Sequence, residues 1–349
     1  MSISYSYLTL EEESNYESFV EHFPKSMFYW TLKYRDLLKQ FLGEQDLYLI
    51  AKDHAGRVVG ALPAFVCSDG GARQILNSMP FYGSHGGAIS CDPEVRQGLV
   101  RYFHSVALDR NCASTTIISP LFEEDTSIYE MNAGRYLEDE RVGQVTHLVQ
   151  PDENVDDQVM GLIHSKTRNM VRKSIKVGVS VTKDRFHGDL DFLHRTHNEN
   201  MKDIGGSAKP RRFFDLVDEI YEYGTEYIIY TAWLDGKPIA ALMLFYFNGF
   251  VEYFTPVIVK EYRSQQPLSL LIYQGMVDAV KQGFTYWNWG GTWKEQEGVY
   301  RFKKSWGAQD HPYRYFTNVL DRRMLDCSRA ELLEKYPYFF VLPFSALET

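Results

Sequence analysis

The pattern of apolar and polar positions occurs twice along the chain. Residues 48–65 align without a gap on residues 228–245, which lie 180 positions later. Both segments predict an apolar strand, a polar turn that contains glycine, and a second apolar strand. The Asp235-Gly236 pair is a strong turn signal because glycine accepts a positive φ. Chance similarity of two buried hairpins is the alternative to a duplication.

The elements around the two hairpins follow the same order, which favours the duplication. An amphipathic helix precedes each hairpin, over 29–42 and 211–223. A further strand, a helix (94–109 and 266–282) and a strand (114–119 and 284–290) follow it. This order predicts an α/β (α+β) protein with two tandem domains, each a mixed, mostly antiparallel sheet flanked by helices.

A new segment begins near residue 150. Asn154 is a candidate N-cap for a helix that runs to Val177, and Gly178 is a natural stop before a strand at Val179 and Val181. We therefore predict an N-terminal domain over 1–150 and a C-terminal domain over 151–349.

Composition and charge limit the class of protein. The 349 residues suffice for two domains, and the net charge of -9 argues against DNA or another polyanion as a non-specific partner. The four cysteines lack C-x-x-C spacing, so no metal site is expected. The N-terminus does not resemble a secretory signal, and the longest apolar run, 238–247, is too short to cross a bilayer. We therefore expect a cytoplasmic protein without a transmembrane segment.

Two basic clusters lie in the second half. The first has five cations between residues 166 and 176, of which Arg168, Arg172 and Lys176 form one stripe on a helix. A solvated face balanced by nearby acids, a phosphate or pyrophosphate site and a contact with an RNA backbone are three open interpretations.

The second cluster contains Lys209, Arg211 and Arg212, next to Gly205-Gly206 and at a predicted helix start. Cations and free backbone N–H groups at a helix start suit an anion. An exposed basic loop is the alternative.

Aromatic and glycine-rich segments supply further candidates. In the second half, a strand containing Trp289 runs into Gly290-Gly291, and Tyr253 is a second candidate aromatic wall of a pocket. At least one tryptophan of this segment should lie in the core. In the first half, the loop over 75–90 holds Tyr82 and His85, which we take as candidate substrate-binding residues.

These features together resemble a known family. The stretches RNMVRKSIKVGV (168–179) and above all GVYRFKKSWG (298–307) are similar to those of the FemABX-like peptidyltransferases, a branch of the GNAT acyltransferase superfamily. The resemblance implies two GNAT-like domains, with the acyl-transfer site in the C-terminal one. It implies an acyltransferase that moves an aminoacyl or acyl group onto an amine of a nucleotide-linked sugar, a peptidoglycan precursor or another cell-surface glycan precursor.

The resemblance also implies site residues. Lys303 matches the family lysine near the reacting carbonyl, and Phe302 is its neighbour. Lys33 matches a lysine that meets the phosphates of the acceptor, and Arg211 or Arg212 matches an acceptor-binding arginine. The family tyrosine beside that arginine is absent here, which speaks against recognition of a peptidoglycan precursor.

The expected co-substrates follow from the same family. No cofactor should be tightly bound, and the acyl donor is aminoacyl-tRNA or acyl-CoA. Residues 262–271 lack the glycine-rich turn of acetyl-CoA-dependent relatives, which argues modestly against acetyl-CoA. The expected acceptor is a nucleotide-linked or lipid-linked glycan precursor.

The expected chemistry is attack of an amine on an ester or thioester carbonyl. Lys303 would stabilise the oxyanion, and Asp203, Glu297 and His85 are the candidate bases, although proton transfer assisted by the substrate is equally open. Two other hypotheses are an acyl-CoA-dependent N-acyltransferase of an amino sugar and a non-catalytic relative that binds a nucleotide sugar or RNA.

Overall fold

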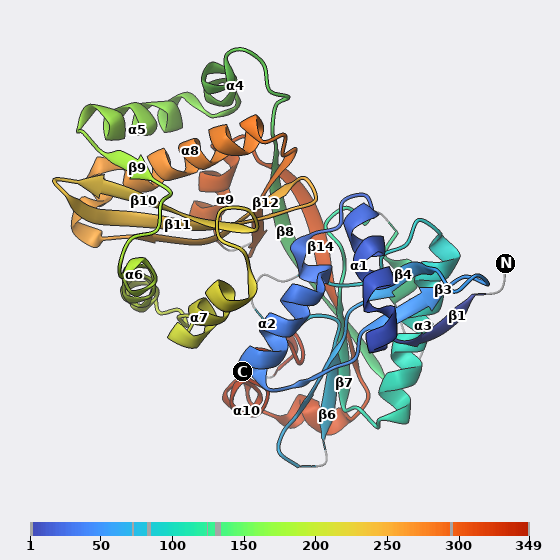
Figure 1. Cartoon of the computed structure of the whole chain (residues 1–349). Helices are drawn as coiled ribbons and strands as arrows, with labels where there is room; N and C mark the ends of the chain where they lie inside the picture. The colour runs from blue at the N-terminus through green and yellow to red at the C-terminus, as the bar shows by residue number, and fades with distance from the viewer. Residues whose placement is uncertain are drawn as a thin grey trace. The chain divides into compact units, whose positions relative to one another are not determined.

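The computed structural model describes residues 3–71, 73–81, 85–123, 125–129, 134–293 and 296–347. The chain forms two compact units (Figure 1). The first unit comprises Met1–Val142 and Pro312–Thr349, and the second comprises Gly143–His311. Among the described residues, no helix combines the length and the apolar character needed to cross a bilayer.

The first unit combines a small sheet with part of a larger one. The small sheet has the order β1-β3-β4, and the strands of the larger sheet follow in the order β2-β5-β6-β7-β14-β8. Its elements are β1 (Ser4–Tyr7), α1 (Glu13–His22), α2 (Leu32–Leu42), β2 (Gln45–Asp46), β3 (Leu49–Lys52), β4 (Val58–Leu62), β5 (Phe65–Ser68), β6 (Gln74–Asn77), α3 (Pro93–Asp109), β7 (Ser114–Ile118), β8 (Arg135–His147), β14 (Gln309–Val319) and α10 (Arg329–Lys335). Short 3₁₀ helices cover Leu10–Glu12, Phe28–Trp30, Ser127–Tyr129, Arg322–Asp326 and Phe344–Ala346.

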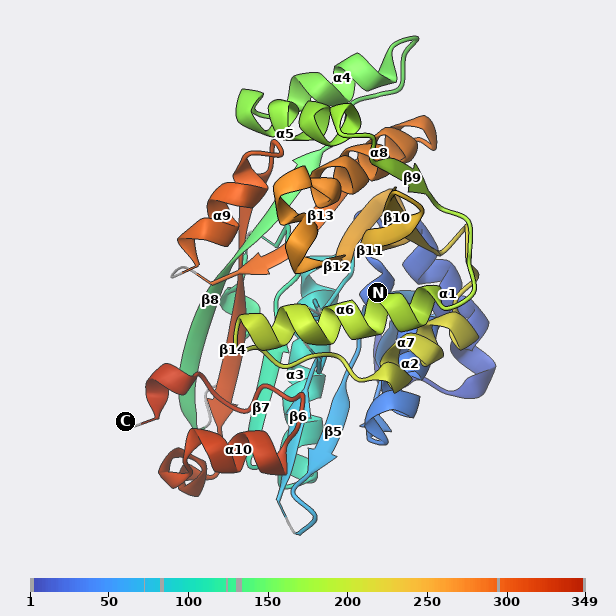
Figure 2. The ribbon, with the colours of Figure 1, turned by 90° about the vertical axis from the view of Figure 1, so that its left-hand side faces the viewer.

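The second unit is a sheet with helices on both faces. Its strands follow in the order β8-β13-β12-β11-β10-β9. Helix α8 packs on one face with α4 and α5 outside it, and α6 packs on the other face beside α7 (Figures 1 and 2). The elements are α4 (Val155–Leu162), α5 (Ser165–Lys176), β9 (Ser180–Thr182), α6 (Asp189–Asp203), α7 (Arg211–Ile220), β10 (Tyr227–Leu234), β11 (Lys237–Phe247), β12 (Phe250–Ile258), a 3₁₀ helix (Lys260–Gln265), α8 (Pro267–Lys281), β13 (Tyr286–Thr292) and α9 (Glu297–Lys304).

The two predicted hairpins form, and they share a detail that supports the duplication. β3 pairs with β4 and β10 pairs with β11, both antiparallel. In each hairpin the second strand carries one extra residue, Val59 and Ile239, and these two positions are again 180 apart. Asp235 and Gly236 both adopt a positive φ, of 51° and 72°, as a tight hairpin turn requires.

The elements after the hairpins match as well. β6 and β7 pair in parallel and are joined through α3, and β12 and β13 pair in parallel and are joined through α8. This confirms the predicted fold class of two mixed α/β units in tandem.

The C-terminal boundary of the predicted second domain needs correction. The prediction assigned 151–349 to one domain, whereas the chain from Pro312 onward belongs to the first unit. The reason is a strand pairing, because Tyr315–Val319 of β14 run antiparallel to β7. The boundary on the other side falls at Val142, inside β8 rather than near 150.

The single helix predicted over 154–177 is two helices. Asn154 caps α4 as predicted, with its side chain accepting from the N–H of Asp157, and Gly178 follows α5 with a φ of 86°. Between the two helices, the backbone N–H of His164 donates to the carbonyl of Ser305 at 2.9 Å. Thr167 also donates to the hydroxyl of Ser305 at 2.9 Å. These contacts to a distant segment fix the break.

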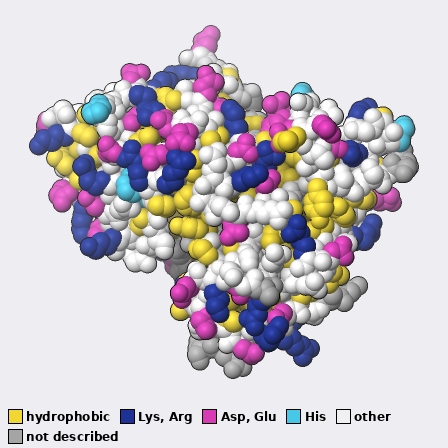
Figure 3. Space-filling view, turned by 60° about the horizontal axis from the view of Figure 1, so that its bottom comes forward, with side chains coloured by type: hydrophobic (Ala, Val, Ile, Leu, Met, Phe, Trp, Pro, Cys, Tyr) yellow, Lys and Arg dark blue, Asp and Glu magenta, His cyan; other side chains and the backbone are white. Residues whose placement is uncertain are grey.

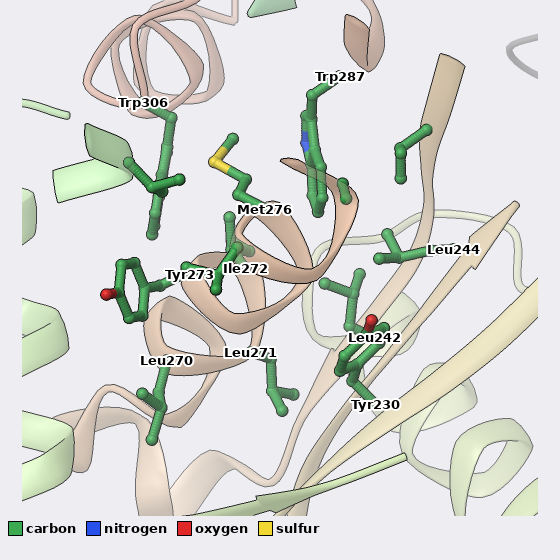
Figure 4. Packing of buried hydrophobic residues seen from close by; sticks show 14 of the residues in the cluster. Tyr230, Leu242, Leu244, Leu270, Leu271, Ile272, Tyr273, Met276, Trp287 and Trp306 are labelled. Atoms are coloured by element: carbon green, nitrogen blue, oxygen red, sulfur yellow. The ribbon is translucent and has the colours of Figure 1, made fainter. Parts of the chain in front are cut away.

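The core of the second unit lies between α8 and the sheet. Figure 4 shows Met276 of α8 between Trp287 and Trp306, and all three are fully buried. Gly275 permits this packing, because a Cβ there would lie 3.1 Å from the Trp287 ring. The core therefore holds β13 and the segment after α9 in fixed positions.

Candidate active site

Strands β12 and β13 separate partway along their length. Their ladder pairs Phe250–Glu252 with Tyr286–Asn288 and then ends, although β12 continues to Ile258 and β13 to Thr292. Both strands lie wholly within the described residues. The backbone groups beyond this fork are therefore not used in pairing between the two strands.

A buried polar pair marks the fork. The side-chain amide of Asn288 donates to the carboxylate of Glu252 at 2.8 Å, and both residues are buried. The amide oxygen of Asn288 accepts from the N–H of Gly290 at 3.0 Å. Satisfied polar groups in a dry interior fix a single geometry, so this pair sets where the strands part.

A β-bulge follows directly on β12. In the pairing with β11, Leu244 faces Tyr253 and Met243 faces Thr255, so Phe254 is the extra residue. A bulge re-aims the local backbone and leaves a residue outside the ladder. The fork thus carries backbone groups that the ladder between β12 and β13 does not use.

Lys303 on α9 lies against the end of β13. Its ammonium donates to the carbonyls of Gly290 and Gly291, at 3.2 and 3.1 Å, and to the hydroxyl of Thr292 at 2.8 Å. Lys303 is buried, and burial lowers the pKa of its ammonium to about 8 although the charge of Glu252 opposes this shift. A positive charge is therefore held in a dry place under the last residues of β13.

The rest of the FKKSWG segment anchors Lys303. Phe302 packs edge to face against Trp289, with ring centroids 6.0 Å apart. The carbonyl of Trp306 accepts from the hydroxyl of Thr146 at 3.0 Å. Gly307 has a φ of 79°, and a Cβ there would lie 2.9 Å from the carbonyl oxygen of Leu162. Phe302, Trp306 and Gly307 thus each have a structural role that the sequence alone did not provide.

Trp289 and Tyr253 lie together, with ring centroids 4.9 Å apart. Trp289 is only 3% exposed, and its indole N–H donates to Thr146 at 2.9 Å. Trp287 is also buried, because residues two apart on a strand share a face. Both tryptophans therefore build the core, which differs from the expectation that Trp289 lines an open pocket.

The basic cluster around residue 210 divides into paired and unpaired cations. Arg211 pairs with Asp191 and Asp215, and Arg212 pairs with Glu219 at 2.7 Å. The two arginines are thus already neutralised by acids.

Lys209 differs from the two arginines. Its ammonium lies 4.9 Å from the centre of the Phe254 ring and makes no ion pair with any described residue. Burial lowers the pKa of Lys209 to about 8. The uncompensated cation of this cluster therefore lies on the bulge residue of β12.

Two of the candidate bases are bound by cations. Asp203, at the end of α6, pairs with Lys260 at 3.3 Å and Arg263 at 3.4 Å. Glu297 pairs with Arg301 one turn further along α9. Neither carboxylate is among the hydrogen-bond partners of Lys303.

The third candidate base is His85, in the first unit. It is fully buried between the rings of Tyr29 and Tyr313, and burial lowers its pKa to about 3. A ring with this pKa does not hold a proton near neutral pH, so the structure does not support His85 as the base.

None of the remaining candidates that the structure describes is a hydrogen-bond partner of Lys303. Lys33 is exposed in the first turn of α2, and Tyr82 lies outside the described residues. Arg168 and Arg172 lie on α5, where Arg168 is partly buried and donates to the carbonyl of Met160 at 3.4 Å.

The first unit contains a cavity of about 150 Å³ that sequence reasoning did not find. Trp30, Met27, Ile89 and Phe122 are among its apolar lining residues, and Arg96 and Glu123 form an ion pair of 2.7 Å at its wall. These residues come from four separate segments, so no sequence motif signals them.

The turn before α8 takes an unusual conformation. Gln266 precedes the helix with a φ of 60°, a region that favours glycine. Residues 262–271, which lack the glycines of acetyl-CoA-dependent relatives, thus still form a left-handed turn before the helix, at Gln266.

Comparisons with known proteins agree with this architecture. Residues 165–325 match the family described as acetyltransferase (GNAT) domain. No curated protein sequence matches the chain.

Three solved structures have a similar fold. The match with the crystal structure of FemX covers 93% of this chain and 99% of the FemX chain, with a TM-score of 0.71 and 13% identity. The match with the C-terminal domain of a putative lysylphosphatidylglycerol synthetase from Agrobacterium fabrum covers 95% of this chain and 99% of that domain. Its TM-score is 0.57 and the identity is 11%. The match with a tandem GNAT protein from the clavulanic acid biosynthesis pathway covers 90% of this chain and 98% of that chain. Its TM-score is 0.55 and the identity is 12%.

Proposed function

We propose that this chain, which contains a GNAT domain match and is similar in fold to FemX and to a tandem GNAT protein, is an acyltransferase that transfers an aminoacyl group to an amine of a nucleotide-linked or lipid-linked glycan precursor. The observation that carries the proposal is the buried ammonium of Lys303 beneath the residues where β13 leaves β12. A fixed positive charge in a dry site is suited to stabilise an oxyanion.

The proposed reaction has two bond changes. The neutral acceptor amine attacks the ester carbonyl of the donor at the fork, and a C–N bond forms. The tetrahedral intermediate then collapses, the C–O bond to the donor breaks, and the donor hydroxyl leaves with a proton that comes from the amine. This proton passes through the substrates themselves, since Asp203 and Glu297 are engaged with cations.

Lys303 has a defined task in this scheme. Its contact with Thr292 is the one that a developing oxyanion would replace, because the Thr292 hydroxyl also donates to Gln144 at 3.1 Å and keeps a partner. The carbonyls of Gly290 and Gly291 keep the ammonium in place meanwhile. The donor carbonyl is then bound more tightly in the transition state than in the ground state.

Lys209 is proposed to bind an anionic group of a co-substrate. It carries no ion pair within the described part of the chain and lies on Phe254, just beyond the fork. Arg211 and Arg212 are weaker candidates for this role, because acidic side chains already neutralise both.

A second candidate function is N-acylation of an amino sugar from an acyl-CoA. The left-handed turn at Gln266 favours it, because a turn into a helix N-terminus suits a pyrophosphate. The support is limited to that turn, since Pro267 has no N–H and the N–H of Ser269 already donates to the carbonyl of Gln266. The ion pairs of Asp203 with Lys260 and Arg263 speak against it, since they occupy the cations next to that turn.

One experiment separates the two functions. Purified protein is incubated with one of two donors, aminoacyl-tRNA or acetyl-CoA, together with a panel of acceptors. The acceptors are UDP-linked amino sugars and lipid-linked muropeptides, and the products are identified by mass spectrometry. An aminoacyl adduct on a glycan precursor supports the first function. An acetyl adduct alone, together with thermal stabilisation by acetyl-CoA of about 2.7 kcal/mol at 100 times its Kd, overturns it.

A further inference from the structure

Helix α5 carries an uncompensated basic face. Residues 158–183 contain six Lys and Arg side chains and neither Asp nor Glu, in a chain of net charge -9. Lys166, Arg168, Arg172, Lys173 and Lys176 lie on α5, and none of them forms an ion pair with a described residue. No described acid therefore lies within ion-pair distance of these five cations, which speaks against the interpretation of a face balanced by nearby acids.

The arrangement of α5 turns these cations outward. Its buried residues are Thr167, Val171 and Ser174, which share one face toward α8. By the helical period, the five cations occupy the opposite side. α5 is the outer layer on that side of the second unit (Figure 1), and its 12 residues span about 18 Å.

The distribution of charge elsewhere is different. On the face shown in Figure 3, basic and acidic side chains are interspersed. Several exposed cations on other elements are held in pairs, for example Arg57 with Asp53 and Arg323 with Asp321, and no other described helix carries five cations without an ion pair. The basic face of α5 is thus not a general property of the surface.

Exposed apolar side chains flank the same face. Met170, Ile175 and Val177 are 39%, 53% and 42% exposed, and they are three of the ten large hydrophobic residues exposed in the described chain. By the helical period, Met170 and Val177 lie on one flank of the cations and Ile175 lies on the other. Cations bordered by apolar side chains match the headgroup layer of an anionic bilayer, whereas a contact with RNA phosphates has no use for the apolar flanks.

We propose that the outer face of α5 docks the protein on an anionic lipid surface. Lys166, Arg168, Arg172, Lys173 and Lys176 meet the headgroups, and the flanking apolar side chains reach between them. This contact is peripheral, reversible and sensitive to salt. It goes beyond the proposed reaction and does not depend on which acyl group is transferred.

The test is sedimentation of the full chain with vesicles of phosphatidylcholine, with or without about 30% phosphatidylglycerol, at about 50 and about 500 mM salt. The wild type should bind the anionic vesicles at low salt and should not bind the neutral vesicles. The triple variant Arg168→Gln, Arg172→Gln, Lys176→Gln should bind about 100-fold more weakly, because each cation contributes roughly fivefold.

A charge-matched control replaces Lys39, Arg57 and Arg323 by Gln. These residues are exposed and paired with acids on other elements, so this variant has the same net charge and should bind like the wild type. A second variant, Lys166→Gln with Lys173→Gln, keeps the test valid if the first variant is unstable. The variant Met170→Ser, Ile175→Ser should lose the binding that remains at high salt.

Three outcomes would overturn the proposal. The wild type stays in the supernatant with anionic vesicles at low salt. The control loses as much binding as the α5 variants. Bulk tRNA binds through the α5 cations while anionic vesicles do not, which would make this face an RNA contact.

Discussion

The ammonium of Lys303 lies 2.8 Å from the hydroxyl oxygen of Thr292, and that hydroxyl donates in turn to Gln144. This chain joins α9, the end of β13 and the last part of β8 in one buried network. Removing the ammonium would leave three oxygen atoms without this donor, so turnover and stability need to be measured together.

Lys303→Met keeps most of the side-chain volume and removes the charge. We expect turnover to fall about 100- to 1000-fold, the usual effect of losing one oxyanion-stabilising group. Product formation followed by mass spectrometry measures this loss, and a thermal melt checks the fold. Lys304→Met is the matched control, because Lys304 is the next residue, is exposed and pairs with Asp310 at 3.5 Å. If Lys303→Met kept the wild-type turnover, Lys303 would have no role in stabilising the oxyanion.

Protonation of Lys303 should couple stability and activity to pH in opposite directions. Burial lowers the pKa of its ammonium from 10.5 to about 8 in the folded chain. Between these values the unfolded chain holds the proton and the folded chain does not, so the free energy of unfolding rises with pH. Turnover that needs the charged form falls as the pH rises through about 8.

Urea denaturation at several pH values between about 7 and 10 measures the stability part. The wild type should gain stability over Lys303→Met across this range. The comparison with the variant cancels the contribution of Lys209, whose pKa is also about 8. Parallel pH profiles of the two proteins would contradict the assigned pKa.

Gly307→Ala should destabilise the second unit. Its φ of 79° is unfavourable for alanine, and the added Cβ would lie 2.9 Å from the Leu162 carbonyl oxygen. We expect a loss of about 2–3 kcal/mol in the free energy of unfolding. Gly298→Ala in α9 is the control, because its Cβ meets nothing within 4 Å, and it should gain up to about 1 kcal/mol. Equal effects of the two substitutions would refute the argument.

Lys209→Met should weaken binding of an anionic co-substrate. The loss of one charge-assisted contact corresponds to about 1.5–3 kcal/mol, or roughly a 10- to 100-fold rise in KM with kcat little changed. Arg212→Gln is the comparison, because Arg212 is exposed and paired with Glu219, and its KM should stay near the wild-type value. A larger effect of Arg212→Gln would reverse the roles of the two cations.

Local pattern predicted much of the fold. The hairpins at 48–65 and 228–245 form because alternation and a glycine turn act over a few residues, and the helices at 94–109 and 266–282 match α3 and α8 within two residues. The break at His164 was missed because its cause, Ser305, lies far along the chain. The return of β14 to the first unit was missed for the same reason, since its pairing partner is β7.

The site divides in the same way. The segment of Phe302 and Lys303 was found by its resemblance to a family, but its contacts with Gly290 and Thr292 depend on how α9 packs against β13. Helical spacing on the predicted helix 211–223 could have distinguished Lys209 from the two arginines, because Asp215 follows Arg211 by four residues. Glu219 lies two turns after Arg212 on the same helix, whereas Asp191 is reached only in the folded chain.

The path of β14 has a consequence for inheritance of the two halves. The polypeptide completes the sheet of its first half only after the second half has been made. A gene cut near its middle would thus yield an N-terminal product that lacks β14. The C-terminal product would contain β14 without its pairing partner β7. Since β14 comes from the second half of the chain, neither half could be lost or borrowed by recombination without the other.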